Sequence, residues 1–166
     1  MAAELRGFGL VTIGVVFGAV FKLMMKSVVM PLLGADPINH AYHYLVGNRE
    51  AIPSTLFAMV VIAGFGEETL FRGFLFERLH KLFGASIGAT AAIVVLTSIG
   101  FSLAHYAVQG VAAVQQATIV GLVFGAIFAT TRSIWLIMSA HASFDLMAYA
   151  IIYFDQEVTV ARAFFN

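Results

Sequence analysis

The strongest constraint on the fold of this chain is a series of five apolar stretches, each close to the length that crosses a lipid bilayer. A membrane-spanning helix needs about 20 predominantly apolar residues. Hydrophobic residues make up 61% of the 166 positions and the mean hydropathy is +0.94, whereas soluble domains are roughly 45 to 50% apolar. The sequence therefore predicts an all-α, polytopic membrane protein with about five transmembrane helices. The stretches run from Phe8 to Met25, Pro53 to Phe76, Ala85 to His105, Val111 to Ala129, and Ile134 to Tyr153.

No internal repeat or soluble segment separates these spans, so we expect a single integral membrane domain over residues 1–166. Residues 53–153 form its motif-bearing core, and residues 1–52 hold the first helix and a polar connection rich in turn-forming residues. Lys22 and Lys26 interrupt the first apolar run where a signal peptide would be cleaved, which favours a retained helix. We expect these lysines to snorkel toward headgroups or to line a surface-lying extension of that helix.

Charge and composition exclude several classes of partner. Nine basic and nine acidic residues give a formal charge of zero, so no basic face is available to bind nucleic acid. The absence of cysteine excludes disulfides, thiolate metal ligands and thiol nucleophiles. We therefore expect partners in the bilayer: the lipid itself and a membrane-embedded or membrane-associated peptide. The small size suggests a multi-pass protein of a bacterial inner (plasma) membrane.

Six ionisable residues lie within the apolar spans, away from the positions that easily reach headgroups. Each charged side chain at bilayer depth costs at least about 2.5 to 3.5 kcal/mol and reads by default as functional. The set comprises Glu67, Glu68 and Arg72 on the second span, His105 at the end of the third, and His141 and Asp145 on the fifth.

The spacing of these residues indicates how they pair. Glu68 and Arg72 are four positions apart, which places them one turn apart on one helix face, where they can form an ion pair. Glu67 lies about 100° round the helix from Glu68 and is left to find another partner. His141 and Asp145 also share one face. Small residues beside these groups would let neighbouring helices approach closely: Gly64, Gly66 and Gly73 on the second span, and Ser139, Ala140, Ala142 and Ser143 on the fifth.

Such a set can support several functions. A buried carboxylate beside a neutral histidine can deprotonate water, and a second histidine can donate a hydrogen bond to a developing oxyanion, which suffices for amide hydrolysis. Two histidines and a carboxylate also suit catalytic zinc, but the HExxH pattern is missing, so zinc is the second choice and no cofactor is expected. A proton-coupled transporter or a non-enzymatic scaffold could keep the same residues, although no repeat or broken helix typical of transporters is visible.

The chain resembles the CPBP family of intramembrane proteases, which contains the prenyl-protein (CAAX) endopeptidases and bacterial proteins linked to bacteriocin processing and immunity. That family carries EExxxR, FxxxH, and HxxxN or HxxxD on successive helices. The matching segments occur in the same order within Pro53 to Tyr153, and they read EETLFR from Glu67 to Arg72, FSLAH from Phe101 to His105, and HASFD from His141 to Asp145.

The resemblance implies a metal-independent glutamate protease. Glu67 and His105 would activate water, His141 and Asp145 would serve the oxyanion, and Glu68 with Arg72 would support the site. Asp145 stands where the prenyl-protein endopeptidases have asparagine, and an ionised aspartate only accepts hydrogen bonds. Either Asp145 is protonated in its buried site, or it orients His141 and the imidazole alone donates; we favour the second alternative. The chain has one helix before the motif-bearing four, fewer than many relatives, and we expect a membrane-associated peptide rather than a prenylated substrate.

The span boundaries add a geometric condition. At 1.5 Å per residue, Glu67 lies about 21 Å from the start of its helix, whereas His105 lies about 30 Å along an antiparallel neighbour. In straight, upright helices these residues would sit at different depths. A shared site requires tilted helices, a shifted third span, or a position near one membrane face.

Overall fold

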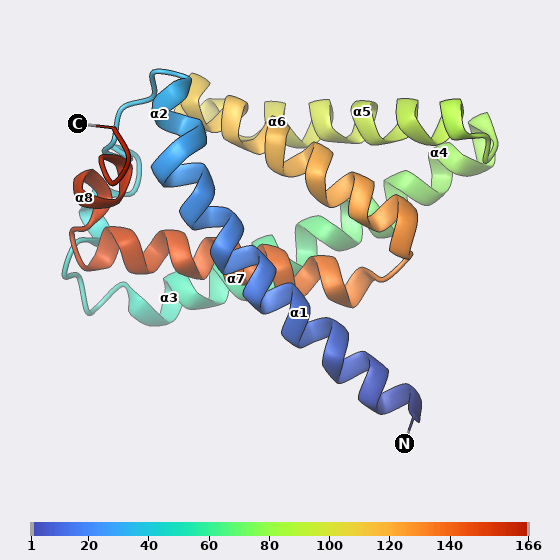
Figure 1. Cartoon of the computed structure of the whole chain (residues 1–166), viewed down its shortest axis with the longest axis horizontal. Coiled ribbons are helices and arrows are strands. Elements are labelled where there is room, and N and C mark those ends of the chain that lie inside the picture. Colours follow the sequence, from blue (N-terminus) through green and yellow to red (C-terminus); the bar gives the residue numbers. More distant parts are fainter. Residues whose placement is uncertain (1, 166) are drawn as a thin grey trace.

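The computed structural model describes the backbone of residues 2–165 and the side chains of residues 7–165, and the backbone it describes forms helices and no strand (Figure 1). Five of the helices are long and apolar enough to cross a membrane, which confirms the predicted all-α fold with five spans. These spans are Gly7–Leu32, Ile52–Phe83, Ile87–Ala104, Tyr106–Thr131 and Ile134–Tyr153.

Two of the spans are composite helices. The first consists of α1 (Ala2–Met24), η1 (Met25–Val29) and α2 (Met30–Leu32), and the second of α3 (Ile52–Phe57), η3 (Ala58–Glu67), η4 (Thr69–Leu75) and α4 (Phe76–Phe83). The segments η1, η3 and η4 are π-helical, with the wider i→i+5 hydrogen bonding that often marks functional sites. The remaining elements are the 3₁₀ turn η2 (His43–Leu45), α5 (Ile87–Ala104), α6 (Tyr106–Thr131), α7 (Ile134–Tyr153) and α8 (Glu157–Ala161).

The helices begin and end at residues suited to those positions. The second span continues seven residues past the expected end at Phe76. The apolar pattern did not reveal this extension, because α4 is amphipathic. The helix stops at Gly84, whose φ of 82° suits glycine. The Ser86 side chain accepts a hydrogen bond from Ala89 N and starts α5. Gly110, with φ 69° and ψ −160°, breaks the helical conformation of α6 near its start.

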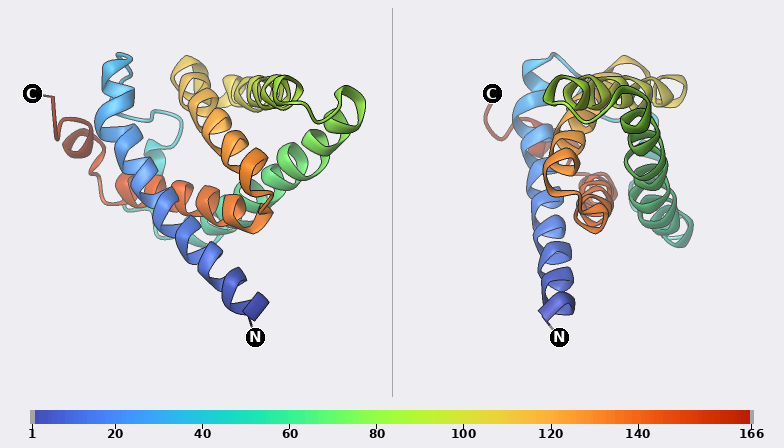
Figure 2. Two further views of the ribbon diagram at one scale, coloured as in Figure 1. Left: turned by 45° about the vertical axis from the view of Figure 1, so that its right-hand side comes forward. Right: turned by 90° about the vertical axis from the view of Figure 1, so that its right-hand side faces the viewer.

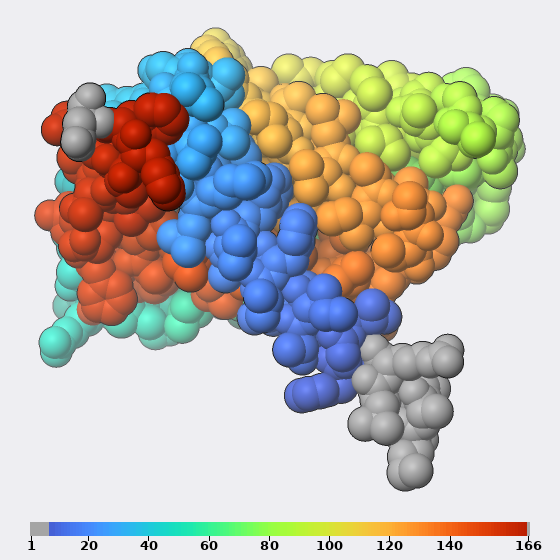
Figure 3. Space-filling model, viewed as in Figure 1, coloured from blue at the N-terminus to red at the C-terminus, as the bar shows by residue number. Residues whose placement is uncertain are grey.

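Helix α7 lies at the centre of the fold, and α1 crosses it obliquely (Figures 1 and 2). The two helices touch at backbone level: a Cβ built on Gly18 would lie 1.9 Å from the carbonyl oxygen of Ala140, and one on Gly14 would lie 2.6 Å from that of Leu136. In the space-filling view, α1 lies as a diagonal blue band over the orange-red surface of α7 (Figure 3). Small residues therefore set the distance between these helices.

The expected glycine contacts of the second span are only partly present. Gly64 lies against α7, where a Cβ would come within 2.7 Å of the Ala142 Cβ. The expectation is wrong for Gly66 and Gly73, because the nearest atoms to a Cβ at either position are carbonyl oxygens of the same span. Wide π-helical turns surround both residues, so the face they share differs from the one that α-helical spacing predicts.

An aromatic core joins α1, α5, α6 and α7. Phe21, Phe101, Phe124 and Phe144 are all buried, and the Phe21 ring lies 6.0 Å from that of Phe124 and 5.6 Å from that of Phe144. Large apolar side chains also remain exposed on the outside, as expected for helices whose outer faces contact lipid. The core lies directly beside the polar residues, because the rings of Phe101 and Phe124 lie 5.8 Å and 5.7 Å from that of His141.

We predict that Gly18→Ala weakens the fold by about 1 to 3 kcal/mol, because the added methyl group overlaps backbone atoms of α7 that cannot rotate away. Gly9→Ala is the matched control on the same helix, since nothing lies within 4 Å of its Cβ position. Unfolding of both variants by SDS titration measures the difference. Equal stability of the two variants would contradict the close α1–α7 contact.

Candidate active site

Glu68 is the buried centre of the polar cluster, with no exposed side-chain surface. Its Oε1 lies 3.0 Å from Nη1 of Arg72 and 2.7 Å from Nδ1 of His141. The ion pair predicted from the four-residue spacing is thus present. The Glu68 carboxylate joins the second span to α7, because its Oε1 accepts hydrogen bonds from both Arg72 and His141.

Arg72 extends the cluster to two further helices. Its Nη2 donates to the carbonyl oxygen of Gly121 on α6 at 3.2 Å, and its guanidinium carbon lies 4.8 Å from the ring centroid of Phe101 on α5. A guanidinium over an aromatic face is attracted by the ring quadrupole. Arg72 therefore both neutralises Glu68 and holds α5 and α6 against the second span.

His141 is fixed by its Nδ1, which donates to Glu68. That bond leaves Nε2 directed at two other carboxylates: it lies 3.7 Å from Oδ2 of Asp145 and 4.0 Å from Oε2 of Glu67. Both distances exceed that of a direct hydrogen bond. Glu68 therefore orients the ring by accepting from Nδ1, whereas Asp145, the residue expected in that role, lies beside the opposite nitrogen.

Glu67 differs from Glu68 in having open space beside it. Its side chain is 31% exposed and that of Asp145 is 26% exposed, and both line a cavity of about 540 Å³. Oε2 of Glu67 is buried and has no hydrogen-bond partner. One carboxylate of the adjacent pair is thus occupied by protein groups, and the other can receive a ligand or water.

His105 lines the same cavity from the end of α5. Its Nδ1 lies 2.8 Å from the carbonyl oxygen of Phe101, to which it donates, so in the neutral ring Nε2 is an acceptor. Because Glu67 lines this cavity as well, the structure brings the two residues to one site, although they come from different spans.

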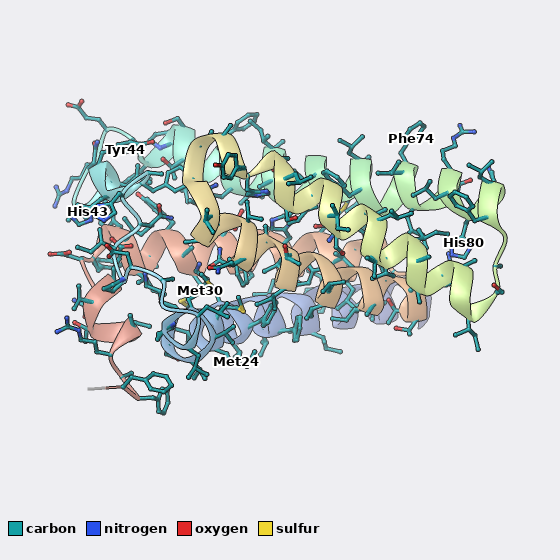
Figure 4. All side chains as sticks on the ribbon, turned by 90° about the horizontal axis from the view of Figure 1, so that it is seen from above. Met24, Met30, His43, Tyr44, Phe74 and His80 are labelled. Carbon is teal, nitrogen blue, oxygen red and sulfur yellow. The ribbon has the colours of Figure 1, made fainter. Side chains whose placement is uncertain are left out.

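The six residues expected at the site therefore fall into two groups. Glu67, His105, His141 and Asp145 line the cavity, whereas Glu68 and Arg72 lie behind it and are almost completely buried. The cavity reaches the connection between the first two spans, where Tyr44 contributes to its wall. Seen from above, Tyr44 and His43 lie at the opposite end of the molecule from Phe74 and His80 (Figure 4).

Sequence analysis did not assign Lys22 to this region, and the expectation that it reaches the surface is wrong. Lys22 is 8% exposed, lines the cavity and donates from Nζ to Oε1 of Gln116 at 2.9 Å. Lys26 also turns inward, 3.6 Å from Oε1 of the buried Glu157. A signal was available: Lys22 also lies within an apolar run, so a desolvation cost applies to it as it does to Glu67.

No three histidine and carboxylate side chains are arranged to hold a metal ion in the part of the chain that the structure describes. His141 is engaged through Nδ1 by Glu68, and His105 through Nδ1 by a backbone carbonyl. Each ring thus presents only Nε2 toward the cavity.

The family described as Type II CAAX prenyl endopeptidase Rce1-like matches residues 49–147, which include all six residues of the cluster. The chain belongs to this family and is therefore a CAAX-type intramembrane protease, a hydrolase acting on peptide bonds. No curated protein and no solved structure matches the chain.

We predict that Arg72→Met destabilises the protein by about 3 to 5 kcal/mol, because it leaves Glu68 buried without its counter-charge. Lys81→Met is the matched control: Lys81 pairs with Glu77 four residues away on the same span, but both side chains are more than half exposed. SDS unfolding of the two variants measures the contrast. An exposed pair contributes little, so the control should unfold at the wild-type midpoint, and similar losses in both variants would contradict the structural role of Arg72.

Proposed function

We propose that the protein is an endopeptidase that hydrolyses a peptide bond of a membrane-associated protein or peptide with water activated by Glu67 and His105. The observation that supports this best is that the two adjacent glutamates have different contacts. Glu68 is occupied by Arg72 and His141, whereas Glu67 faces a 540 Å³ cavity shared with His105 and with Nε2 of His141.

In the first step, the Glu67 carboxylate acts as general base. A water between Glu67 and His105 gives one proton to the carboxylate and attacks the carbonyl carbon of the substrate, while Nε2 of His105 accepts its second hydrogen bond. The bond from Nδ1 of His105 to Phe101 supports this role, because it leaves Nε2 as the acceptor.

In the second step, the carbonyl oxygen carries the negative charge of the tetrahedral intermediate, and His141 donates to it from Nε2. The ring is then doubly protonated, since Nδ1 already donates to Glu68. The carbon–nitrogen bond breaks, and the proton held by Glu67 passes to the leaving amine. Asp145, 3.7 Å from Nε2, faces the positive ring without contacting the oxyanion, which a carboxylate would repel.

The substrate segment must be extended where it is cut. In a helix the carbonyl groups are already hydrogen-bonded, so a helical substrate unwinds near its end or arrives as a flexible peptide.

We propose that the whole chain, residues 1–166, forms one integral domain of a bacterial inner membrane. No metal ion or cofactor takes part in the proposed steps.

We predict that Glu67→Gln lowers cleavage of a membrane-tethered peptide by at least about 100-fold, since the amide cannot accept the water proton. Glu77→Gln is the matched control, because Glu77 lies on the same span but on the exposed surface. Cleavage in detergent, metal content and the unfolding midpoint are measured on the same samples.

Full activity of folded Glu67→Gln would contradict the role of Glu67. Cleavage that depends on a stoichiometric metal and stops on chelation would instead support the zinc alternative. Absence of cleavage by folded, metal-free wild type over a broad peptide library would contradict the proposed reaction.

A further inference from the structure

Lys22 is a buried lysine that does not pair directly with a carboxylate among the described side chains. It lies on α1, outside the region shared with the family, and is 8% exposed. Its Nζ donates to Oε1 of Gln116 and sits 4.9 Å from the ring centroid of Phe144. Among the side chains of residues 7–165, no carboxylate lies within 4.0 Å of it. An ammonium has three donors, and a buried charge without a counter-ion is costly.

Lys26, four residues further along the same helix, is a lysine that does have a carboxylate partner. Its Nζ lies 3.6 Å from Oε1 of Glu157 and donates to the carbonyl oxygen of Pro37. Glu157 is itself buried and also accepts from the backbone N–H of Asn39 and from Nδ1 of His43. Lys26 therefore has a carboxylate partner, whereas Lys22 has none within 4.0 Å among the described side chains.

The position of Lys22 connects it to catalysis. Lys22 and Gln116 line the catalytic cavity and also a second cavity of about 480 Å³. The second cavity is formed by the end of the first span, residues 35–41, the start of α6 and the end of α7. Asn39 and Gln109 are further polar residues in the walls of both cavities. A peptide that extends from the catalytic cavity into the second one passes the Lys22 ammonium.

We propose that Lys22 and Gln116 form a carboxylate-binding site that positions the substrate beside the scissile bond. This inference rests on the proposed peptidase function and adds a specificity-determining residue to it. Gln116 accepts from Lys22 through Oε1, which leaves its amide N–H groups and the remaining ammonium N–H groups to donate to an anion. The carboxylate is either the C-terminus of the substrate or an acidic side chain, because both offer the same acceptor oxygens.

The test measures kcat/KM for two pairs of membrane-tethered peptides. The first pair differs at the C-terminus, which is a free acid or an amide. In the second pair both peptides end in an amide and carry either aspartate or asparagine beyond the cut. We expect wild type to favour one carboxylate form by about tenfold or more. A free-acid preference identifies the C-terminus, and an aspartate preference identifies a side chain. Lys22→Met should reduce that ratio to near one. The control Lys81→Met removes an exposed charge outside both cavities and should keep the wild-type ratio.

A second experiment separates this inference from the proposed function. The affinity of the same peptides, carrying a fluorescent label, is measured by anisotropy for Glu67→Gln and for the double variant Glu67→Gln with Lys22→Met. If no variant cleaves, the proposed function fails, while loss of carboxylate-selective binding in the double variant still supports the site. Equal affinity for acid and amide forms would overturn it, as would an unchanged ratio in Lys22→Met. Where Lys22→Met does not fold, Gln116→Leu provides the same comparison. A Lys22 effect seen only with added anionic phospholipid would overturn the proposal in favour of a lipid phosphate.

Discussion

The architecture depends on the need to neutralise one fully buried carboxylate, that of Glu68. Its partners come from its own helix, in Arg72, and from α7, in His141. Arg72 in turn reaches the backbone of α6 and the ring of Phe101 on α5. Four helices therefore meet at a single charge, and removal of Arg72 would leave that buried carboxylate without its guanidinium counter-charge.

This arrangement also separates structural and chemical roles between neighbouring residues. Glu67 directly precedes Glu68 on the same helix, but its side chain lies on a different side of that helix, toward the cavity. Because Glu68 takes both the arginine and the Nδ1 of His141, the cavity-facing groups keep their free acceptors and donors: an oxygen of Glu67 and Nε2 of each histidine. Two identical side chains thus differ in their surroundings: Glu68 joins the helices, and Glu67 faces the cavity.

Much of this could be predicted from the sequence because it depends on local spacing. Apolar length gave the five spans, and the four-residue interval gave the Glu68–Arg72 pair. The contacts that complete the site are not local. Glu68 and His141 are 73 positions apart, and Lys22 and Gln116 are 94 apart. The π-helical winding of η3 and η4 also shifts side chains off the faces that α-helical periodicity assigns, which explains the failed expectation for Gly66 and Gly73.

The backbone-level contact between α1 and α7 bears on how small such a protease can be. The family match begins at residue 49, yet the face of α7 beside His141 is covered by a helix that ends before that point. Gly18 rests on the carbonyl of Ala140, the residue immediately preceding His141. A fragment cut to the matched region would retain the six ionisable residues but lose one wall of their chamber. The cavity that these residues line therefore extends beyond the region by which the family is recognised.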